Sequence, residues 1–456
     1  MARTCALALT QALAGAAVLC PSGLAWAQAS SATLASSRID DPAGLSSFFG
    51  ALDDLKAGRR TRPVHVLQIG DSHSAADHIS GALRARLQAR FGEGGRGVLP
   101  AGRPFAAYNP RQVSVEQSDG WRLEASYLPT NWTTHAALSQ PGAAQPASGA
   151  FGLSGFRLVA LRAGASVTIR ADPEAQFDEA VVCAVAGAGA ASLGLDIDAD
   201  RHEIHVASPG QGPNCRTIET AGLHRTLRLT AHGPLTLLSL GAFRRGGVAL
   251  SNLGVIGAQL RNFAERDDAT MAAELKAYHP DLILLAFGTN EGFERSLSGA
   301  EYENLMRAQI QRLKRLAPGA AVLVVGPPDA DTVRPDIPED GKADLGFACL
   351  PLSPAELAEY PRLIAERSAA LARWYPPPVL QIVRSAQRQA AAEEHVGFWD
   401  WAGRLGGPCS AHAFTKADPR LVRGDHVHFT TAGGEMVADL LTGDLISAWA
   451  AAAGHR

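Results

Sequence analysis

A serine at the end of a predicted strand is the first residue of this 456-residue chain that could do chemistry. Ser72 follows the apolar run 64–69 and the pair Gly70-Asp71, and a segment with helical apolar spacing begins at Ile79. A serine between a strand and a helix N-terminus is exposed at the carboxyl edge of an α/β sheet, where free N–H groups favour an anion. That position suits a nucleophile, which needs access and stabilisation of its oxyanion. The alternative is an ordinary helix N-cap, since Asp and Ser are common there.

A carboxylate and an imidazole lie three residues apart near the C-terminus. Asp425 and His428 belong to the polar stretch 425–430, which precedes the last predicted helix. An Asp three residues before a His can hold the ring through its Nδ1–H and leave Nε2 as a base. By itself the stretch is also compatible with a polar surface loop, and we interpret its neighbour His426 as a solvated residue at the rim.

Two further stretches at predicted strand ends offer donors for an oxyanion. Gly257 follows a predicted strand that contains Gly254, and a glycine allows the backbone to come close to a ligand. Asn290 follows the apolar run 282–287 and presents a side-chain amide at the same edge. Backbone N–H groups and a side-chain amide are the donors that form oxyanion holes. Each stretch alone is also compatible with a simple turn.

The rest of the chain supplies the elements that must position these residues. Strands are predicted at 64–69, 252–256, 281–287, 320–325, 379–383 and 397–401. Helices are predicted at 43–57, from Ile79, after Gly257, at 298–316, at 354–374, behind 383 and at 431–449. Strands that alternate with helices indicate a largely parallel sheet covered on both faces.

A different pattern fills residues 111–249. Short runs alternate apolar and polar residues, as at 156–161 and 224–229, and turns rich in Gly and Pro separate them. Alternation with regular turns predicts an antiparallel β-sandwich. We therefore expect an α/β domain in two parts, 41–110 and 250–456, interrupted by a β-rich insertion.

The four stretches, taken in order, resemble the motifs of the SGNH (GDSL-type) hydrolase superfamily. The resemblance covers roughly 43–110 and 250–447, and it implies a flavodoxin-like three-layer α/β sandwich with a parallel sheet. It also implies roles for the candidates, with Gly257 fitting the family position better than Gly254. The implied nucleophile is Ser72, the base is His428 oriented by Asp425, and the oxyanion donors are the N–H groups of Ser72 and Gly257 and the amide of Asn290.

Two departures from the common motifs point to one branch of the superfamily. His73 replaces the Leu of Gly-Asp-Ser-Leu, and Glu291 replaces the usual Asp after the Asn. With the Phe-Trp-Asp-Trp stretch at 398–401, they resemble the exported peptidoglycan O-acetylesterases. Those enzymes carry a carbohydrate-binding-like β-domain inserted after the serine segment, and the insertion at 111–249 is similar in place and type.

This resemblance implies a secreted serine esterase that removes O-acetyl groups from peptidoglycan sugars through an acetyl-serine intermediate. The expected partner is therefore an acetylated glycan. Three alternatives stay open: an O-acetyltransferase, an acetylesterase for another polysaccharide, and a non-catalytic glycan-binding protein with the same fold. The balance of 42 Lys+Arg against 45 Asp+Glu disfavours a nucleic-acid-binding protein.

The N-terminus is predicted to be a secretory signal. Arg3 precedes the apolar run 5–19, and the small residues Ala25 and Ala27 stand at the positions that a signal peptidase reads. We expect a signal peptide at 1–27, a flexible lead-in at 28–40, and a periplasmic or secreted protein with no stable membrane span. The alternative is an uncleaved anchor, although the run is short for a span of about 20 residues.

Removal of the signal leaves four cysteines, and an even number in an exported chain favours two disulfides. Pairing neighbours, Cys183–Cys215 and Cys349–Cys409, keeps each bridge within one predicted domain, although four cysteines allow three connectivities. No metal or cofactor is expected. Asp196-x-Asp198-x-Asp200 resembles the start of a calcium loop, but Arg201 stands where such a loop needs glycine.

Overall fold

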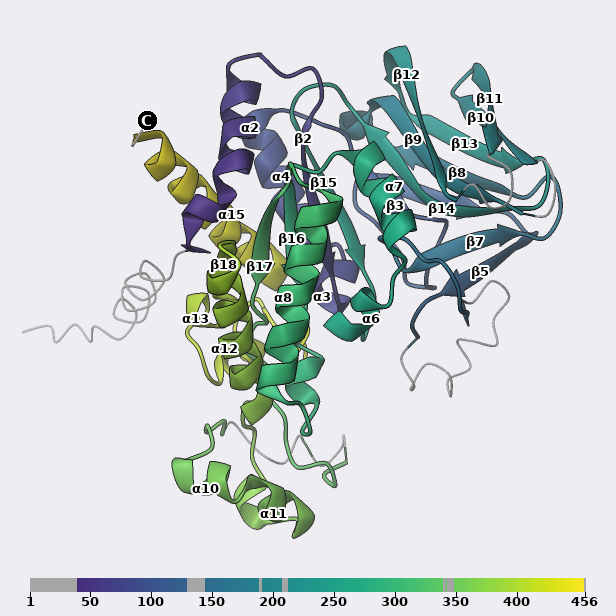
Figure 1. The fold of residues 1–456 in the computed structure, drawn as a ribbon. Coiled ribbons are helices and arrows are strands. Elements are labelled where there is room, and N and C mark those ends of the chain that lie inside the picture. The colour runs from purple at the N-terminus through teal and green to yellow at the C-terminus, as the bar shows by residue number, and fades with distance from the viewer. Residues whose placement is uncertain are drawn as a thin grey trace, which may run out of the picture.

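A parallel sheet with helices on both faces forms the larger part of the molecule (Figure 1). The computed structural model describes residues 39–128, 144–187, 191–206, 212–338, 342 and 348–454, so the predicted signal at 1–27 lies outside the described residues. The sheet has the order β1-β18-β17-β16-β2-β15. Its strands are β1 (Ile39–Asp40), β2 (Val64–Gly70), β15 (Val248–Gly254), β16 (Leu282–Ala286), β17 (Ala321–Val325) and β18 (Gly397–Trp399). All neighbours are parallel except β1, which pairs antiparallel with β18 at the edge.

Alternate residues of the strands are buried against different helices. In β2, Val64 and Val66 join one apolar cluster, whereas Leu67 and Ile69 join the other. The first face is covered by α2 (Ser46–Lys56), α4 (Ile79–Phe91) and α15 (Thr431–Gly454). The second is covered by α7 (Asp268–Tyr278), α8 (Gly299–Leu316) and α12 (Pro378–Glu393). Burial on both faces explains why these strands are nearly continuous apolar runs, and it confirms the predicted three-layer α/β fold.

Several expected elements differ from those in the structure. Residues 379–383 are not a strand but the first turns of α12, where Val379, Leu380 and Val383 are buried with helical spacing. A short apolar run is ambiguous between strand and helix, and here Pro378 at the first helical position starts a helix. The strand expected at 252–256 lies earlier, at β15, and Ile39–Asp40 of the expected flexible lead-in form β1.

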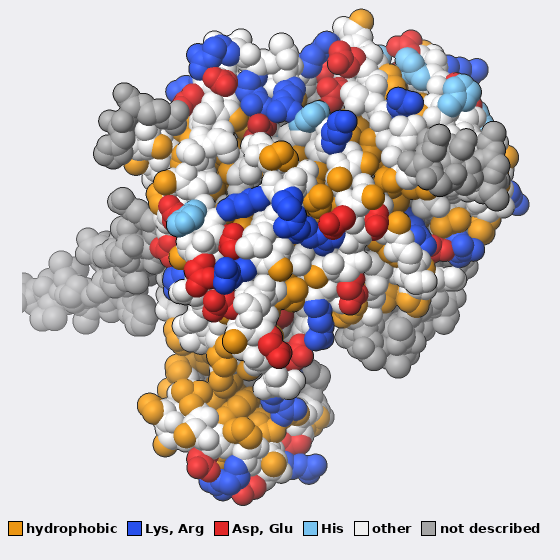
Figure 2. Space-filling model, viewed as in Figure 1, with side chains coloured by type: hydrophobic (Ala, Val, Ile, Leu, Met, Phe, Trp, Pro, Cys, Tyr) orange, Lys and Arg blue, Asp and Glu red, His pale blue; other side chains and the backbone are white. Residues whose placement is uncertain are grey.

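The single helix expected at 354–374 is divided into short pieces that project from the end of the sheet (Figure 1). They are α10 (Pro354–Ala358), α11 (Tyr360–Ala365) and the 3₁₀ turn η6 (Ala369–Leu371). Pro361 lacks the N–H that a continuous helix would need, and Arg367 has a left-handed φ of 52°. Figure 2 shows apolar side chains exposed on this projecting part, and Leu350 and Leu357 are among the exposed large hydrophobic residues.

Two antiparallel sheets form the β-sandwich that was predicted as an insertion. One has the order β11-β10-β13-β8-β4, and the other has the order β12-β9-β14-β7-β5-β6, with β3 paired to β14. The first contains β4 (Val113–Gln117), β8 (Ser166–Ala171), β10 (Ala191–Ile197), β11 (Asp200–Val206) and β13 (Thr226–Ala231). The second contains β3 (Gly97–Pro100), β5 (Trp121–Ala125), β6 (Gln145–Pro146), β7 (Phe156–Ala160), β9 (Phe177–Ala186), β12 (Asn214–His224) and β14 (Leu235–Phe243). The β5–β6 pair is parallel. The core of the sandwich is continuous with the α7–α8–α12 face of the parallel sheet.

Both predicted disulfides are present. Cys183 and Cys215 are directly opposite each other on β9 and β12, so this bridge joins neighbouring strands of the sandwich. Cys349 and Cys409 join the projecting segment to α14 (Ser410–Thr415). Each bridge therefore ties elements that are distant in the sequence but adjacent in the fold.

The last helix bears on the expectation that the protein has no stable membrane span. Within the described residues, α15 is long and apolar enough to cross a bilayer by length and composition alone. Val437, Leu441 and Leu445 of α15 are buried in the core of the α2–α4–α15 face, and the core helix of a globular domain has the same composition.

Candidate active site

Ser72, His428 and Asp425 lie in one chain of hydrogen bonds. Ser72 begins the short helix α3 (Ser72–Ala75) at the carboxyl end of β2, and His428 precedes α15. The Ser72 Oγ to His428 Nε2 distance is 2.9 Å, and His428 Nδ1 lies 2.8 Å from Asp425 Oδ2. The fold thus brings together three residues up to 356 positions apart. In such an arrangement the imidazole can take a proton from the hydroxyl while the carboxylate holds the other ring nitrogen.

Asp425 stays ionised because its second oxygen is also held. Oδ1 accepts hydrogen bonds from the backbone N–H groups of Val427 and His428, both at 3.0 Å. Partial burial would raise the pKa of Asp425, but the His428 ring and these two N–H groups hold it well below its usual range. The carboxylate therefore accepts from His428 Nδ1–H, which leaves Nε2 without a proton and able to act as a base.

Polar residues beneath Ser72 hold its turn in place. Asp71 caps α3 by accepting from the His73 N–H at 2.9 Å. Gln68 Nε2 donates to Ser74 Oγ at 2.7 Å, and Asn252 Nδ2 donates to the Ser74 carbonyl at 2.9 Å. We did not predict these supports. The available signal was the presence of polar residues, Gln68 and Asn252, inside two largely apolar strands.

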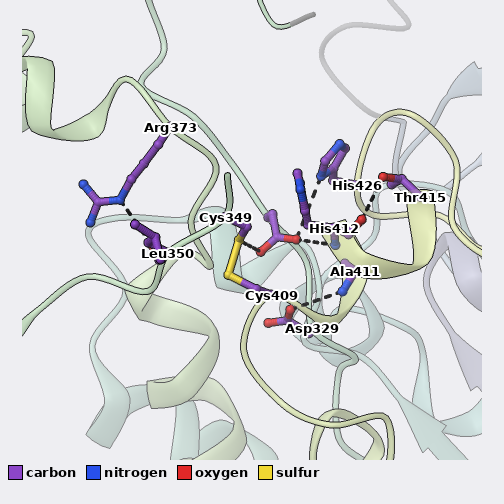
Figure 3. Close-up of a disulfide and its surroundings, with 10 residues drawn as sticks. Asp329, Cys349, Leu350, Arg373, Cys409, Ala411, His412, Thr415 and His426 are labelled. Atoms are coloured by element: carbon purple, nitrogen blue, oxygen red, sulfur yellow. Dashed lines mark hydrogen bonds and ion pairs between the residues drawn. A yellow bond between two sulfur atoms is a disulfide. The ribbon is translucent and has the colours of Figure 1, made fainter. Parts of the chain in front are cut away.

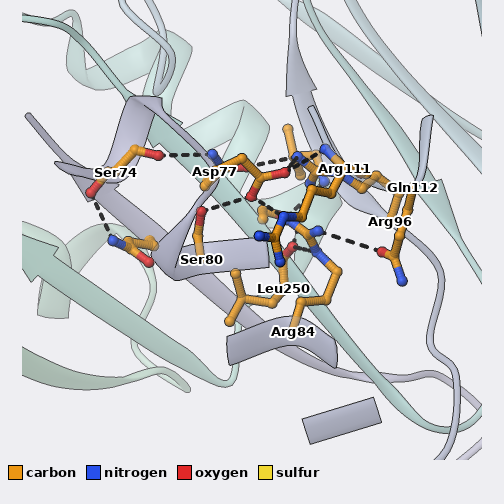
Figure 4. A network of polar contacts seen from close by, with 12 residues as sticks. Ser74, Asp77, Ser80, Arg84, Arg96, Arg111, Gln112 and Leu250 are labelled. Atoms are coloured by element: carbon orange, nitrogen blue, oxygen red, sulfur yellow. Dashed lines mark hydrogen bonds and ion pairs between the residues drawn. The ribbon is translucent and has the colours of Figure 1, made fainter. Parts of the chain in front are cut away.

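A buried ionic network continues from this turn toward the sandwich (Figure 4). Asp77, with a left-handed φ of 50°, binds Arg84 at 2.9 Å, and Arg96 donates to Asn252 Oδ1 at 2.7 Å. Asp77 also accepts the Arg111 N–H at 2.8 Å. Burial would raise the pKa of Asp77, but Arg84 and Arg96 lower it below its ordinary value. The network therefore joins the nucleophile segment to the chain that enters the sandwich.

The two predicted oxyanion segments also meet at this edge. Asn290 ends the loop after β16, and its Nδ2 donates to the Ala258 carbonyl at 2.9 Å. Gly257 lies in the loop after β15 with φ of 74°, a conformation that favours glycine. An added Cβ on Gly254 would collide with the backbone of Asp71 and Ala75, so Gly254 allows close packing of β15 on the nucleophile turn. A primary amide has two N–H bonds, so Asn290 keeps one for a ligand while it holds the Gly257–Ala258 loop.

Glu291 supports this loop from below. It is buried, and its Oε1 accepts from the Leu260 N–H at 2.6 Å, whereas Oε2 is buried without a recorded hydrogen-bond partner. Burial and, to a smaller extent, the nearby Asp71 raise the pKa of Glu291 to about 7, against the backbone N–H groups that lower it. The sequence indicated Glu291 only as a departure from the family motif.

We predict that Glu291→Gln changes how stability depends on pH. The folded pKa is raised from 4.5 to about 7, so the contribution of Glu291 to stability is present below pH 4.5 and lost as the pH rises through 7. Glutamine cannot ionise, so the variant gains stability relative to the parent on going from acid to mildly alkaline pH. The gain is at most roughly 3 kcal/mol. Urea unfolding of both proteins at the two pH extremes measures it. Glu265→Gln, an exposed control, should give no gain, and a pH-independent difference for Glu291→Gln would contradict the assignment.

The loop at 425–430, which carries Asp425 and His428, is held from its other side. His426 was expected to be solvated, but it is buried and stacks on Trp374, with ring centroids 3.5 Å apart and 4° between planes. Burial lowers the pKa of His426 to about 4, so the stacked ring is neutral at physiological pH. The Asp331 N–H donates to the His426 carbonyl at 3.1 Å. This contact fixes the backbone two residues before His428.

The Cys349–Cys409 disulfide lies beside this clamp (Figure 3). Asp331 Oδ1 is 3.3 Å from Cys349 Sγ, and Asp331 Oδ2 accepts from the His412 N–H at 2.7 Å. Asp331, Cys349 and Cys409 are near enough to suggest a metal site, but both thiols are consumed in the disulfide. Phe398, Trp399 and Trp401 are buried, so they form core rather than a surface for stacking on sugar.

Comparisons with known proteins found one matching family model and several similar solved structures. Residues 220–436 match the model of the GDSL-like lipase/acylhydrolase family. A solved structure titled "Peptidoglycan O-acetylesterase in action, 5 min" has a TM-score of 0.67 and 21% identity over 91% of this chain and 99% of that chain. A putative GDSL-like lipase from Parabacteroides merdae gives 0.28 and 17% over 43% of this chain and 73% of that chain. The module CsCBM6-3 from Clostridium stercorarium, in complex with cellobiose, gives 0.20 and 13% over 33% of this chain and 93% of that chain. No curated protein matches the sequence.

The family match supports a hydrolase of the esterase type, and the fold is a parallel α/β sheet that a β-sandwich interrupts in sequence. Residues 220–436 resemble the GDSL-like lipase/acylhydrolase family, in line with the resemblance of the motifs, and the fold is similar to that of the peptidoglycan O-acetylesterase. The matched segment starts within β12 and so does not include Ser72. The Gly-Asp-Ser motif lies outside the matched segment in sequence, and the fold places it beside that segment.

Proposed function

We propose that this chain is a periplasmic or secreted serine esterase that removes O-acetyl groups from peptidoglycan sugars through an acetyl-serine intermediate. The observation that carries the proposal is the hydrogen-bonded chain from Ser72 through His428 to Asp425. The choice of substrate is supported by the similarity of the whole fold to a peptidoglycan O-acetylesterase. Two disulfides are compatible with an oxidising compartment, which supports export behind a signal peptide at 1–27.

The reaction begins with attack of Ser72 Oγ on the acetyl carbonyl carbon as His428 Nε2 takes the hydroxyl proton. The carbonyl oxygen becomes an oxyanion, which accepts from the N–H groups of Ser72 and Gly257 and from the amide of Asn290. The tetrahedral intermediate collapses, the sugar oxygen leaves with the proton from His428, and an acetyl ester on Ser72 remains. Water then attacks this ester, with His428 as base, and acetate leaves as Ser72 regains its proton.

The oxyanion role of Asn290 predicts a loss of rate without a matching loss of binding. Asn290→Ala should lower kcat by about 10²–10³-fold, because one donor is lost where charge develops. KM should change much less, since the ground-state carbonyl carries little charge. Steady-state kinetics on an acetyl ester, with Tm as the check on folding, make the measurement. An unchanged kcat in a folded variant would remove Asn290 from the oxyanion hole.

Acetate released from O-acetylated peptidoglycan is the test of the substrate. We expect faster release from this polymer than from acetylated xylan at equal acetyl content. Faster release from xylan, or cleavage of small acetyl esters alone, would overturn the peptidoglycan assignment while keeping the esterase. Transfer of the acetyl group to an added glycan in place of release would make the enzyme a transferase. Binding of the polymer with no release of acetate from any ester would favour a glycan-binding protein.

A further inference from the structure

A second cleft lies at the opposite end of the parallel sheet from Ser72. It has a volume of about 700 Å³ and lies between β12 of the sandwich and the C-terminal end of α7. These two elements are side by side in Figure 1. His65, near the start of β2, is in its lining, whereas Ser72 follows the other end of that strand. At about 3.3 Å per residue, the strand separates the two sites by roughly 20 Å.

The sandwich wall of this cleft carries two carboxylates that repel each other. Glu179 on β9 and Glu219 on β12 are directly opposite in the strand register, so their side chains lie on the same face. Both line the cleft, and among the described residues neither has a salt bridge. Burial raises the pKa of Glu179, and Glu219 and Asp178 raise it further, whereas Arg245 and Arg62 lower it but do not cancel the rise. A cross-strand pair of like charges is destabilising unless a cation lies between or above them.

The facing wall carries the opposite charge. Arg62, Lys276 and His279 line the cleft from the α/β side, and all three are exposed. Burial lowers the pKa of His279, and Arg62 and Lys276 lower it further against Asp281, so His279 is neutral at physiological pH and Arg62 and Lys276 supply the positive charge of this wall. Arg62 has a distant partner in Asp281, at 3.9 Å, which Arg60 contacts more closely at 2.8 Å. The cleft therefore presents a negative wall and a positive wall, each made of groups of like charge.

We propose that this cleft binds a short peptide that carries a free ammonium group and a free carboxylate. The ammonium group lies against Glu179 and Glu219, and the carboxylate lies against Arg62 and Lys276. A ligand with both charges relieves repulsion on both walls, whereas an uncharged sugar relieves neither. This ligand class rests on the proposed function, because peptidoglycan differs from other acetylated glycans in bearing short peptides with amino and carboxyl groups. The second site would then hold the peptide part of the polymer whose sugar is deacetylated at Ser72.

Calorimetric titration of the intact protein with the tetrapeptide Ala-Glu-Lys-Ala tests the proposal. Two blocked forms are compared: one with both amines acetylated, and one with both carboxylates converted to amides. We expect the free peptide to bind at least about tenfold more tightly than either blocked form. Glu179→Gln with Glu219→Gln, and separately Lys276→Ala, should each weaken binding of the free peptide by a similar factor. Glu116→Gln, which alters an exposed carboxylate elsewhere on the sandwich, is the matched control and should not weaken it.

Three results would overturn the proposal: no binding of the tetrapeptide, equal binding of the blocked forms, or binding unaffected by the cleft substitutions. Titration with Ca²⁺ tests whether a metal cation binds at the acidic wall instead of the peptide. Ca²⁺ binding that the Gln variants abolish, without peptide binding, would make the cleft a cation site. Hydrolysis of p-nitrophenyl acetate should be the same in every variant. A wrong peptide-binding proposal is therefore distinguishable from a wrong esterase proposal. If the esterase proposal were wrong, the parent protein itself would not hydrolyse this ester.

Discussion

Ser72→Ala should reduce kcat for acetyl-ester hydrolysis by at least about 10⁴-fold, because the variant has no atom to form the acetyl intermediate. KM should change little, since the oxyanion donors and the rest of the site remain. Residual activity above the uncatalysed rate is expected, because the oxyanion hole can still stabilise attack by water. Initial rates over a range of ester concentrations measure both parameters.

The control for this prediction is Ser47→Ala, which replaces an exposed serine of α2 with the same loss of one hydroxyl. It should leave kcat and Tm unchanged. Ser72 is nearly buried and its Oγ bonds only to groups of the site, so Ser72→Ala should also keep the Tm of the parent. If Ser72→Ala retained a tenth or more of the parent kcat, the nucleophile would have to be another residue.

Asp425→Asn should cost about 10⁴-fold in kcat, although the side chain keeps its shape. The reason lies in the two oxygens of Asp425. Asn Oδ1 can still accept from the N–H groups of Val427 and His428, which places its NH₂ group against His428 Nδ1. The ring would then have to accept at Nδ1 and carry its proton on Nε2. In that tautomer it cannot take the proton of Ser72.

Kinetics across a pH series, with stability measured beside it, check this second prediction. The pKa of Asp425 is lowered in the fold, so its contribution to stability is fully present above its unfolded pKa and is lost as the pH falls from there through the folded pKa. Asp425→Asn should therefore lose less stability on acidification than the parent. A decrease in kcat smaller than tenfold, with the loop still folded, would mean that Asp425 does not set the tautomer of His428.

The edge of the sheet explains why the candidate site could be predicted without a structure. The carboxyl ends of parallel strands meet at one edge, so polar motifs that follow predicted strands are expected to lie together. Ser72 after β2 and Asn290 after β16 follow this rule directly. His428 and Asp425 follow no strand. We predicted that they belong to the site from their spacing and from their order in the chain.

Other parts of the site depend on contacts that no local pattern contains. His426 stacks on Trp374, and Glu291 accepts a hydrogen bond from the Leu260 N–H. Both contacts join segments that only the tertiary fold brings together. The strand expected at 379–383 was wrong for a related reason. Apolar β-branched residues are typical of strands, but here the spacing of the buried side chains continues through α12 as a helix.

Trapping the acetyl group is the most direct test of the central claim, that Ser72 carries the acetyl group between sugar and water. The protein is mixed with an activated acetyl ester, quenched in acid within the first turnovers, digested and analysed by mass spectrometry. We predict a peptide that contains Ser72 and is heavier by one acetyl group, which is absent from Ser72→Ala and is lost when the quench is delayed until the ester is consumed. Acetate released at the parent rate with no acetylated Ser72, or with the acetyl group on another residue, would contradict the account.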